Sequence, residues 1–322
     1  MKKVLVVGAS GQLGTRVFEK LTELNQYAIR IFVREDSVYS HLAPANHEVV
    51  IGDLRDRDSI DRAVNGVDII IATANTAAPR KKEDTFKAVD TQGYRDLIDA
   101  AKKHGVGHFI YTSILPGRGH IPLNASKAQT EAYLIASGVP YTIFQPAAFM
   151  DVYFAFMGST IPLKNEVAAT VNRNFPFMQN FFKSVKDNID NGMIGIIGEG
   201  TVRQNYIAID NVADFLVKAI DNPVTINTTH LLGGPEALSA LEVKAIFEKA
   251  LGRPLGIKKT PALVMKLMGS IFSWINPTIS NIFKLNHMGA TVPGLADCRE
   301  LADKLGIHLI SAEEYLRTKL KE

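Results

Sequence analysis

Three glycines near the N-terminus have the spacing of a phosphate-binding loop. Gly8, Gly11 and Gly14 lie in the segment VVGASGQLG, between an apolar stretch and a stretch with helical periodicity. In such a loop Gly8 permits a tight turn, Gly11 lets the backbone approach a pyrophosphate, and Gly14 lets the helix pack closely on the strand. The amides of Gln12 and Leu13 would then point at the phosphates. Because the motif stands between a strand and a helix, it predicts a dinucleotide site rather than an ordinary turn.

The residue after the second apolar segment bears on which dinucleotide is bound. A site for NAD usually carries Asp or Glu at this point, where it binds the ribose hydroxyls. Here the segment AIRIFV ends at Val33 and Arg34 follows. A guanidinium can form paired hydrogen bonds with the 2′-phosphate of NADP. Alternatively Arg34 is a solvated loop residue and Glu35 or Asp36 binds the ribose, so the sequence favours NADP and leaves NAD open.

A carboxylate follows the third apolar segment. Asp53, in GDLRD, lies where its side chain could accept a hydrogen bond from the adenine amino group. An aspartate that only stabilises a turn would look the same in the sequence.

Six short apolar segments are predicted to be the strands that position these residues. They are rich in branched side chains and bounded by turn signals: KVLVV, AIRIFV, HEVVIG, VDIIIAT, GHFIYTS and YTIFQP. Between several of them, apolar residues recur at helical spacing in GTRVFEKLTEL, DSIDRAVNG and TQGYRDLIDAAKKHG. Nearly continuous apolar strands that alternate with helices predict an α/β fold with a parallel sheet covered on both faces.

The pattern changes after about residue 150. Residues 149–182 hold seven of the sixteen phenylalanines and show no clean alternation. This stretch could form an apolar wall for a substrate or the core of a smaller lobe. We predict a dinucleotide-binding domain over residues 1–150, to which residues 193–235 return, and a small substrate-binding lobe formed by residues 151–192 and 236–322.

Composition argues against several other classes of protein. Lys and Arg number 36 against 33 Asp and Glu, which gives no reason to expect a nucleic-acid partner. The single cysteine, Cys298, is compatible with a reducing compartment. The first apolar run is too short for a signal peptide, and ALVMKLMGSIFSWI is shorter than the roughly 20 residues that span a bilayer. We therefore expect a cytoplasmic protein without a transmembrane segment, and we predict no metal site.

An apolar stripe in residues 260–289 is expected to be covered by the rest of the chain or by a partner. At helical spacing the segment carries Leu263, Val264, Leu267, Met268, Ile271, Phe272 and Ile275, and Pro277 then forces a break. We predict that the stripe forms a roof over the substrate pocket. The alternatives are docking onto another copy or a different protein through the C-terminal helices, and shallow membrane association.

The motifs taken in order resemble those of atypical short-chain dehydrogenases/reductases of the NmrA-like group, which are related to isoflavone-reductase-like enzymes. The matching segments cover roughly residues 1–155 and 195–220: GASGQLG, FVRED, GDLRD, DTQGYRDLIDAAKKHGVGHFIYTS, KAQTEAYLIASGVPYTIFQP and NYIAIDNVADFLVKAI. The resemblance implies a Rossmann-type doubly wound parallel sheet with a smaller C-terminal substrate lobe, and NADP(H) or NAD(H) as ligand. One departure is Gln145-Pro146, where the group usually has Arg-Pro, which puts a local ion pair in doubt.

The resemblance also implies a set of site residues. Ser113 and Lys127 would face the nicotinamide end of the cofactor. The other expected cofactor contacts, beside the glycine loop, Arg34 and Asp53, are Ser10, Leu54, Thr73, Ala74 and Asn75.

Leu123 stands where the tyrosine-dependent relatives have the phenol that protonates the substrate carbonyl. Isoflavone-reductase-like members also lack that tyrosine and are still reductases, so its loss does not exclude catalysis. Lys127 could act as acid or base if a dehydrated pocket lowers its pKa, or it could only clamp the ribose. Ser113 could donate to a substrate oxygen or bond its own loop. His120 and Tyr153 are further candidates near the pocket mouth, with solvation and lobe packing as the alternatives.

The resemblance implies two functions of different classes. One is an NADP(H)-dependent reductase that transfers hydride to a carbonyl or activated double bond of a small apolar substrate, such as a quinone or enone. The other is a non-catalytic NAD(P)-sensing regulator or assembly protein of the NmrA type, which acts through a partner.

Overall fold

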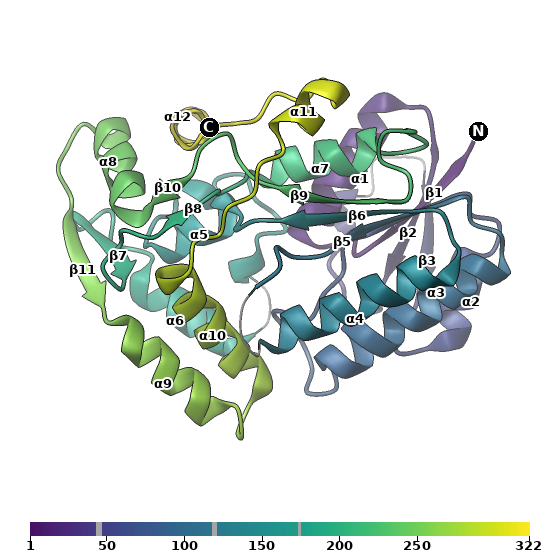
Figure 1. Ribbon diagram of the computed structural model, residues 1–322, viewed down its shortest axis with the longest axis horizontal. Helices are drawn as coiled ribbons and strands as arrows, with labels where there is room; N and C mark the ends of the chain where they lie inside the picture. Colours follow the sequence, from purple (N-terminus) through teal and green to yellow (C-terminus); the bar gives the residue numbers. More distant parts are fainter. Residues whose placement is uncertain (43–46, 118–120, 173–174) are drawn as a thin grey trace.

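The computed structural model describes residues 1–42, 47–117, 121–172 and 175–322. Seven parallel strands form its central sheet in the order β3-β2-β1-β4-β5-β6-β9 (Figure 1). This doubly wound order reverses direction between β1 and β4 and confirms the predicted Rossmann-type sheet. All six expected strands are present, and a seventh extends the sheet beyond β6: β1 (Lys3–Val7), β2 (Ala28–Val33), β3 (His47–Ile51), β4 (Ile69–Ala72), β5 (His108–Thr112), β6 (Tyr141–Pro146) and β9 (Thr228–Leu232).

Helices cover both faces of the sheet (Figure 1). One face carries α1 (Gln12–Leu24), α7 (Ile209–Lys218) and α11 (Arg299–Leu305), and the other carries α2 (Arg57–Val64), α3 (Tyr94–Lys103) and α4 (Pro122–Ser137). Successive side chains of a strand point to opposite faces. Val4 and Val6 of β1 therefore enter one hydrophobic cluster, and Leu5 and Val7 enter the other. Burial on both faces explains why the strands are apolar throughout.

A π-helical segment, η2 (Phe86–Gly93), precedes α3 and was not predicted as a separate element. It lies close to the loop after β3, because a Cβ atom at Gly93 would be 2.4 Å from the Leu54 carbonyl oxygen. The carbonyl of Asp90 in η2 accepts a hydrogen bond of 2.6 Å from the Thr130 hydroxyl on α4. The π-helical turn thus places the Asp90 side chain beside α4 and the carboxyl end of the sheet.

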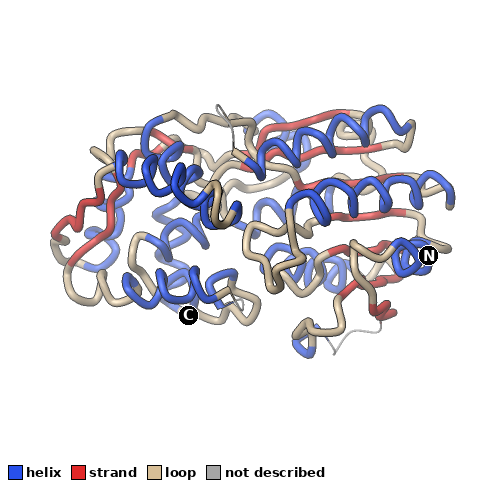
Figure 2. The backbone as a smooth tube through the Cα atoms, turned by 90° about the horizontal axis from the view of Figure 1, so that it is seen from below, coloured by secondary structure: helices blue, strands red, loops and turns tan. Residues whose placement is uncertain are grey.

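A second lobe lies beside the carboxyl ends of the strands (Figures 1 and 2). Its core includes Met150, Phe154, Phe247 and Tyr315. Its helices and short strands are α5 (Met150–Phe156), α6 (Pro176–Val185), β7 (Met193–Ile197), β8 (Arg203–Gln204), β10 (Leu238–Ser239), α8 (Ala240–Leu251), β11 (Gly256–Thr260), α9 (Ala262–Phe272), α10 (Pro277–Thr291) and α12 (Ala312–Lys321). Single 3-10 turns also occur in both lobes: η1 (Ser40–Leu42) follows β2 in the large lobe, and η3 (Ile161–Leu163) and η4 (Thr170–Asn172) lie in the small lobe.

The chain crosses between the lobes at different points from those expected. β7 pairs in parallel with β11, so the strand at residues 193–197 joins the small lobe rather than the large sheet. Conversely, α11 packs with α7 through Leu301 and Leu305. Just before α11, the Cys298 thiol donates to the Gly233 carbonyl at 2.9 Å, beside the end of β9. Periodicity shows which residues are buried but not what they are buried against, and the division into two folding units stays a proposal.

Candidate cofactor and substrate site

A cavity of about 580 Å³ runs along the carboxyl edge of the sheet and into the small lobe. Its lining includes Gly8 after β1 and Thr73 after β4, where the strand order reverses and open α/β sheets bind ligands. Every cofactor residue expected from the sequence lines this one cavity: Gly8, Ser10, Gly11, Gln12, Leu13, Gly14, Arg34, Asp53, Leu54, Thr73, Ala74, Asn75 and Lys127.

The glycine loop leaves no room for side chains at two positions. Gly8 has a φ of 89°, and a Cβ atom there would lie 2.8 Å from the Ala74 nitrogen. A Cβ at Gly14 would lie 2.1 Å from the Gly8 oxygen. Gly11 begins α1 in an extended conformation, and the first turn of α1 carries no acidic residue. The first amides of a helix have no partner within it, so this end of α1 can bind an anion.

The Gln12 side chain is engaged by the small lobe rather than directed at a ligand. Its Oε1 accepts hydrogen bonds from the Thr170 nitrogen at 3.3 Å and the Thr170 hydroxyl at 3.2 Å. A segment 158 residues away in the sequence thereby holds the start of α1. The backbone N–H of Gln12, rather than its side chain, is the group suited to binding a phosphate.

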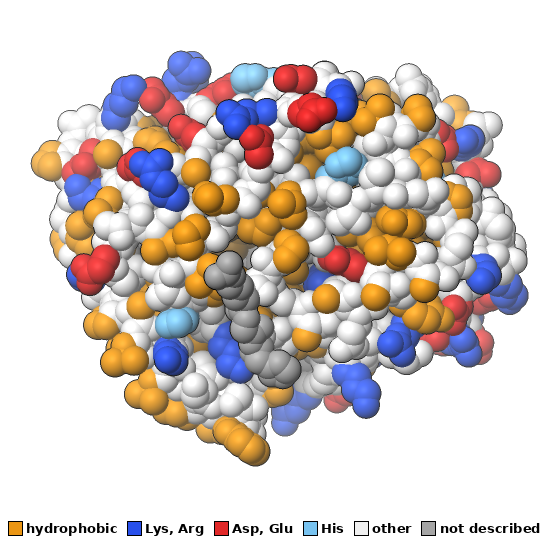
Figure 3. All heavy atoms as spheres, viewed as in Figure 1, with side chains coloured by type: hydrophobic (Ala, Val, Ile, Leu, Met, Phe, Trp, Pro, Cys, Tyr) orange, Lys and Arg blue, Asp and Glu red, His pale blue; other side chains and the backbone are white. Residues whose placement is uncertain are grey.

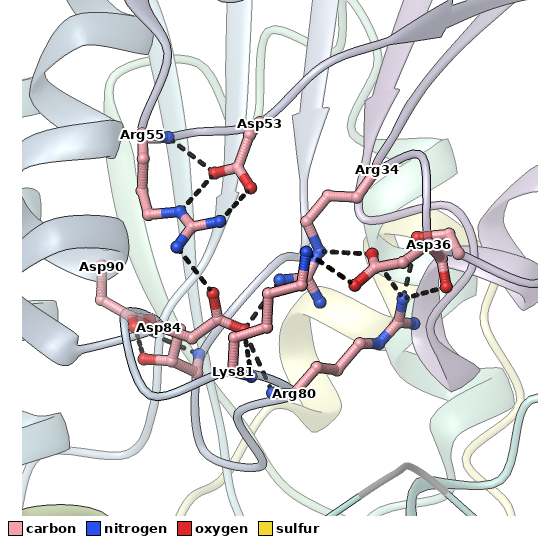
Figure 4. Close-up of polar contacts among 10 residues, drawn as sticks. Arg34, Asp36, Asp53, Arg55, Arg80, Lys81, Asp84 and Asp90 are labelled. Atoms are coloured by element: carbon pink, nitrogen blue, oxygen red, sulfur yellow. Dashed lines mark hydrogen bonds and ion pairs between the residues drawn. The ribbon is translucent and has the colours of Figure 1, made fainter.

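Three arginines surround one carboxylate at the β2 end of the cavity; we call Arg34, Arg55, Arg80 and Asp84 the arginine cluster (Figure 4). Arg34 Nη1 donates to Asp84 Oδ2 at 2.7 Å, and Arg55 Nη1 lies 3.4 Å from Asp84 Oδ1. The backbone nitrogen of Arg80 also donates to Asp84 Oδ2, at 3.0 Å. The Asp84 side chain is only 2% exposed. Burial alone would raise the pKa of Asp84, but the Arg34 hydrogen bond and charge lower it overall.

Two of the carboxylates considered as ribose or adenine ligands, Asp36 and Asp53, are also bound to cations (Figure 4). Asp53 accepts from Arg55 Nε at 2.9 Å and from Arg55 Nη2 at 2.7 Å. Asp36 lies 3.3 Å from Lys81 Nζ and 3.7 Å from Arg80 Nη1. Sequence reasoning missed Arg55, Arg80 and Asp84. The basic run PRKKED was a signal, but Asp84 lies 50 residues from Arg34 and only the fold brings them together.

A buried lysine–aspartate pair adjoins the cavity, which Lys127 lines and Asp90 does not. Lys127 Nζ is 4.0 Å from Asp90 Oδ1 and donates to the Thr112 carbonyl at 3.0 Å. Asp90 Oδ2 accepts from the Thr76 nitrogen at 3.1 Å and from the Thr76 hydroxyl. Lys127 and Asp90 are 3% and 0% exposed. Burial lowers the pKa of Lys127 against the opposing charge of Asp90, and burial raises the pKa of Asp90 against the opposing charge of Lys127.

The remaining positions considered for catalysis have hydrogen bonds to other residues or lie outside the described part of the chain. Ser113 lines the cavity, but its hydroxyl donates to Glu131 Oε1. Gln145 Nε2 donates to both oxygens of Glu131, at 3.0 and 2.9 Å. Where the group usually has an arginine, this chain therefore has hydrogen bonds from an uncharged amide in place of an ion pair. Leu123 lines the cavity and its nitrogen donates to Asn281 Oδ1 at 3.0 Å. His120 lies outside the described residues.

Apolar side chains form the small-lobe wall of the cavity. Phe149, Phe156 and Met178 line it, while Phe154 is buried in the lobe's own core, so the aromatic stretch serves both purposes considered from the sequence. Tyr153 also does both, because it lines the cavity and its ring centroid is 4.8 Å from that of Tyr206. In the described part of the chain, no cluster of three or more His, Cys, Asp and Glu residues could hold a metal ion.

The roof prediction is right for α10 and wrong for α9. Ile282, Leu285 and Met288 of α10 line the cavity. The predicted stripe lies mainly on α9, and most of its side chains, including Leu263 and Leu267, are exposed instead of covered. The break at Pro277 is confirmed, since α9 ends at Phe272 and Pro277 begins α10.

Comparisons with known proteins agree with this geometry. The model of the NmrA-like family matches residues 1–303. The photosystem II assembly factor Ycf39 of Trieres chinensis is 28% identical over 274 residues, which cover 84% of this chain and 76% of that protein. An NAD(P)H azoreductase of Xenophilus azovorans is 25% identical over 254 residues, covering 78% and 75%.

Two solved structures share the fold across nearly the whole chain. NADPH-dependent quinone oxidoreductase QOR2 of Escherichia coli, complexed with NADPH, gives a TM-score of 0.73 at 19% identity and covers 99% of this chain and 100% of that one. Triphenylmethane reductase of Citrobacter sp., complexed with NADP(H), gives 0.73 at 18% identity and covers 98% and 99%.

Proposed function

Because the chain belongs to the NmrA-like family, we propose that it is an NADP(H)-dependent reductase. Its substrate is a small, largely apolar molecule, such as a quinone or enone, with a carbonyl or activated double bond. The observation that carries the proposal is one cavity lined by the glycine loop, by Arg34, Arg80 and Asp84 of the arginine cluster, by the buried Lys127 and by an apolar wall.

The residues at the sheet edge fit a dinucleotide phosphate. Gly8 and Gly14 are packed too closely for any side chain, and they line the cavity at the start of α1, whose first backbone amides can bind a pyrophosphate. Arg34 and Arg80 both line the cavity at the β2 end, where a 2′-phosphate would distinguish NADP from NAD. NAD remains the alternative, with its ribose bound at the same end. Bound NADPH supplies the hydride, and the protein supplies orientation and exclusion of water.

Lys127 is the group of this site best suited to hold and give up a proton. Its Nζ lies in a buried position that lowers its pKa, and Asp90 beside it has a raised pKa. A proton can therefore be moved between or away from these groups at a lower cost than from an exposed lysine. The Ser113 hydroxyl is committed to Glu131, which leaves Ser113 a positioning role.

The names of several relatives support reduction. The azoreductase, QOR2 and triphenylmethane reductase are all named for NAD(P)H-dependent or reductive activities on aromatic or quinone compounds. The apolar wall formed by Phe149, Phe156 and Met178 suits such a substrate.

A second function is favoured by two specific observations. Leu123 stands at the position of the usual proton donor, and several curated relatives that cover 84% of this chain are named as photosystem II assembly factors. A protein that binds NAD(P) without turnover and acts through a partner would have both features.

An assay of binding and consumption separates the two functions. NADPH affinity is measured by fluorescence titration, and NADPH oxidation is then followed with a panel of quinones and enones. We expect binding and oxidation in the wild type. Lys127→Arg should still bind NADPH but lose turnover, because an arginine keeps the charge and does not release its proton. Binding without oxidation of any substrate would favour the sensing function, and absence of NADPH binding would contradict both.

A further inference from the structure

The exposed side of α9 and the turn after it form a continuous apolar surface. Trp274 is 93% exposed, and Leu263 and Ile275 are each 71% exposed. These residues recur at helical spacing and lie on one side of the segment. We define the α9 face as Leu263, Val264, Leu267, Ile271, Trp274 and Ile275, all of which are exposed.

The opposite side of α9 is firmly packed on α10. Met265 and Gly269 are buried, and the Ser280 hydroxyl donates to the Gly269 carbonyl at 2.7 Å. The rings of Phe272 and Phe283 stack with centroids 5.8 Å apart. The α9 face is therefore held in place on an ordered hairpin at the outer edge of the small lobe (Figure 1).

The charged residues of the segment that carries the α9 face have one sign. Residues 249–296 contain no Asp or Glu but include Lys258, Lys259, Lys266 and Lys284. Lys259 pairs with Glu199 at 2.6 Å, and within the described residues the other three form no ion pair. Figure 3 shows hydrophobic atoms along the lower left edge, over α9, with a basic side chain beside them.

We propose that the α9 face docks on the surface of an anionic lipid bilayer, with Trp274 entering the headgroup region. An amphipathic helix with lysines beside its apolar side and an exposed tryptophan has the chemistry of an interfacial helix. Anionic lipids complement the unpaired lysines. A second copy of the chain would instead bring together two lysine-rich segments that contain no Asp or Glu. Among the described helices, none is long and apolar enough to cross a membrane, so the contact is peripheral.

Trp274 makes the proposal directly measurable, because it is the chain's one tryptophan. The full-length protein is mixed with vesicles of phosphatidylglycerol and phosphatidylcholine, or of phosphatidylcholine alone, while tryptophan emission and co-sedimentation are recorded. We expect a shift of emission to shorter wavelength and pelleting only with the anionic vesicles, both reversed by salt. Neither depends on nucleotide binding, so the result is independent of the proposed reductase function.

Two variants and their matched controls test the contribution of each part of the surface. Leu267→Gln/Ile271→Gln and Lys258→Glu/Lys266→Glu should each weaken vesicle binding, the second by at least about tenfold. The controls Ile135→Gln on α4 and Lys102→Glu on α3 change exposed residues elsewhere and should leave binding unchanged. Equal binding to neutral vesicles, or no binding to either kind, would overturn the proposal. An emission shift that depends on protein concentration without vesicles would assign the face to a second copy.

Discussion

Two cation–carboxylate sites that differ in solvation adjoin the cavity. In the arginine cluster, Asp84 accepts from the Arg34 side chain and from the Arg80 backbone, and Arg34 itself is partly exposed. In the buried pair, Lys127 and Asp90 are 4.0 Å apart, and each has nearly all of its surface removed from water. In Figure 4 no dashed line joins Asp90 to the network around Asp84.

This difference decides what each site can do. A carboxylate that accepts from a guanidinium and from backbone amides stays ionised, and its pKa falls. In a buried pair with few donors, desolvation disfavours both charges. Burial therefore raises the pKa of Asp90 and lowers the pKa of Lys127, and each shift favours the neutral form. The first arrangement suits recognition of an anion such as a phosphate, and the second suits storage and transfer of a proton.

The largest effect is expected when the buried pair is broken. Lys127→Met should lower the free energy of unfolding by ~3–5 kcal/mol, because it leaves Asp90 buried without its cation. Lys127→Met/Asp90→Asn should be more stable than the single variant, since neither charge remains. Urea unfolding measures both. Lys304→Met, which breaks the exposed pair with Glu300, is the control and should cost less than about 1 kcal/mol. Equal losses for Lys127→Met and Lys304→Met would remove the contrast between the sites.

A smaller effect is expected from the arginine cluster, and it concerns binding. Arg34→Ala should weaken NADPH by about 1.5–3 kcal/mol, roughly 10- to 150-fold, because a charged hydrogen bond to the 2′-phosphate is lost. NADH binding should change little. Dissociation constants for both nucleotides test this, with Arg299→Ala as the control, since Arg299 binds Asp297 outside the cavity. Equal affinities for NADPH and NADH in the wild type would contradict the assignment of Arg34.

The smallest effect is a difference in acid stability. The pKa of Asp84 is lowered from its ordinary value of 3.8. The carboxylate therefore stabilises the folded protein above about pH 4, and this contribution is lost as the pH falls through the lowered pKa. Asp84→Asn should lose less stability than the wild type between about pH 5 and the acid limit of folding, as measured by urea unfolding at each pH. Asp90, whose pKa is raised, should not give this pattern. A steeper acid loss in Asp84→Asn than in the wild type would show that Asp84 does not stabilise the fold as a carboxylate.

The central sheet could be predicted because its signals are local. The glycine spacing, the apolar strands and the helical periodicity between them each depend on neighbouring residues, and all the predicted strands were found. The cofactor residues followed from motifs attached to those strands. The arginine cluster and the Asp90–Lys127 pair could not be predicted, because their members lie on different elements and η2 places Asp90 through an unforeseen π-helical turn.

The error on α9 has a different cause. The apolar residues of 260–289 are as dense as expected, but their density does not require that all of them be covered by this chain. Periodicity distinguishes a helix with an apolar stripe from a polar helix. It does not distinguish a helix face that packs within the chain from one that stays exposed. Side chains of α10 line the cavity, whereas most of the apolar stripe on α9 is exposed.

The buried thiol of Cys298 lies at the junction between α11 and the central sheet and reports when that junction opens. Cys298 is the one cysteine of the chain. Its sulfur accepts a hydrogen bond from the Gly233 amide, and its thiol donates one to the Gly233 carbonyl. A thiol reagent can reach it only when the segment before α11 leaves the end of β9. Burial also raises the pKa of Cys298, so little reactive thiolate forms while the junction is closed. The rate of modification therefore measures how often this junction opens.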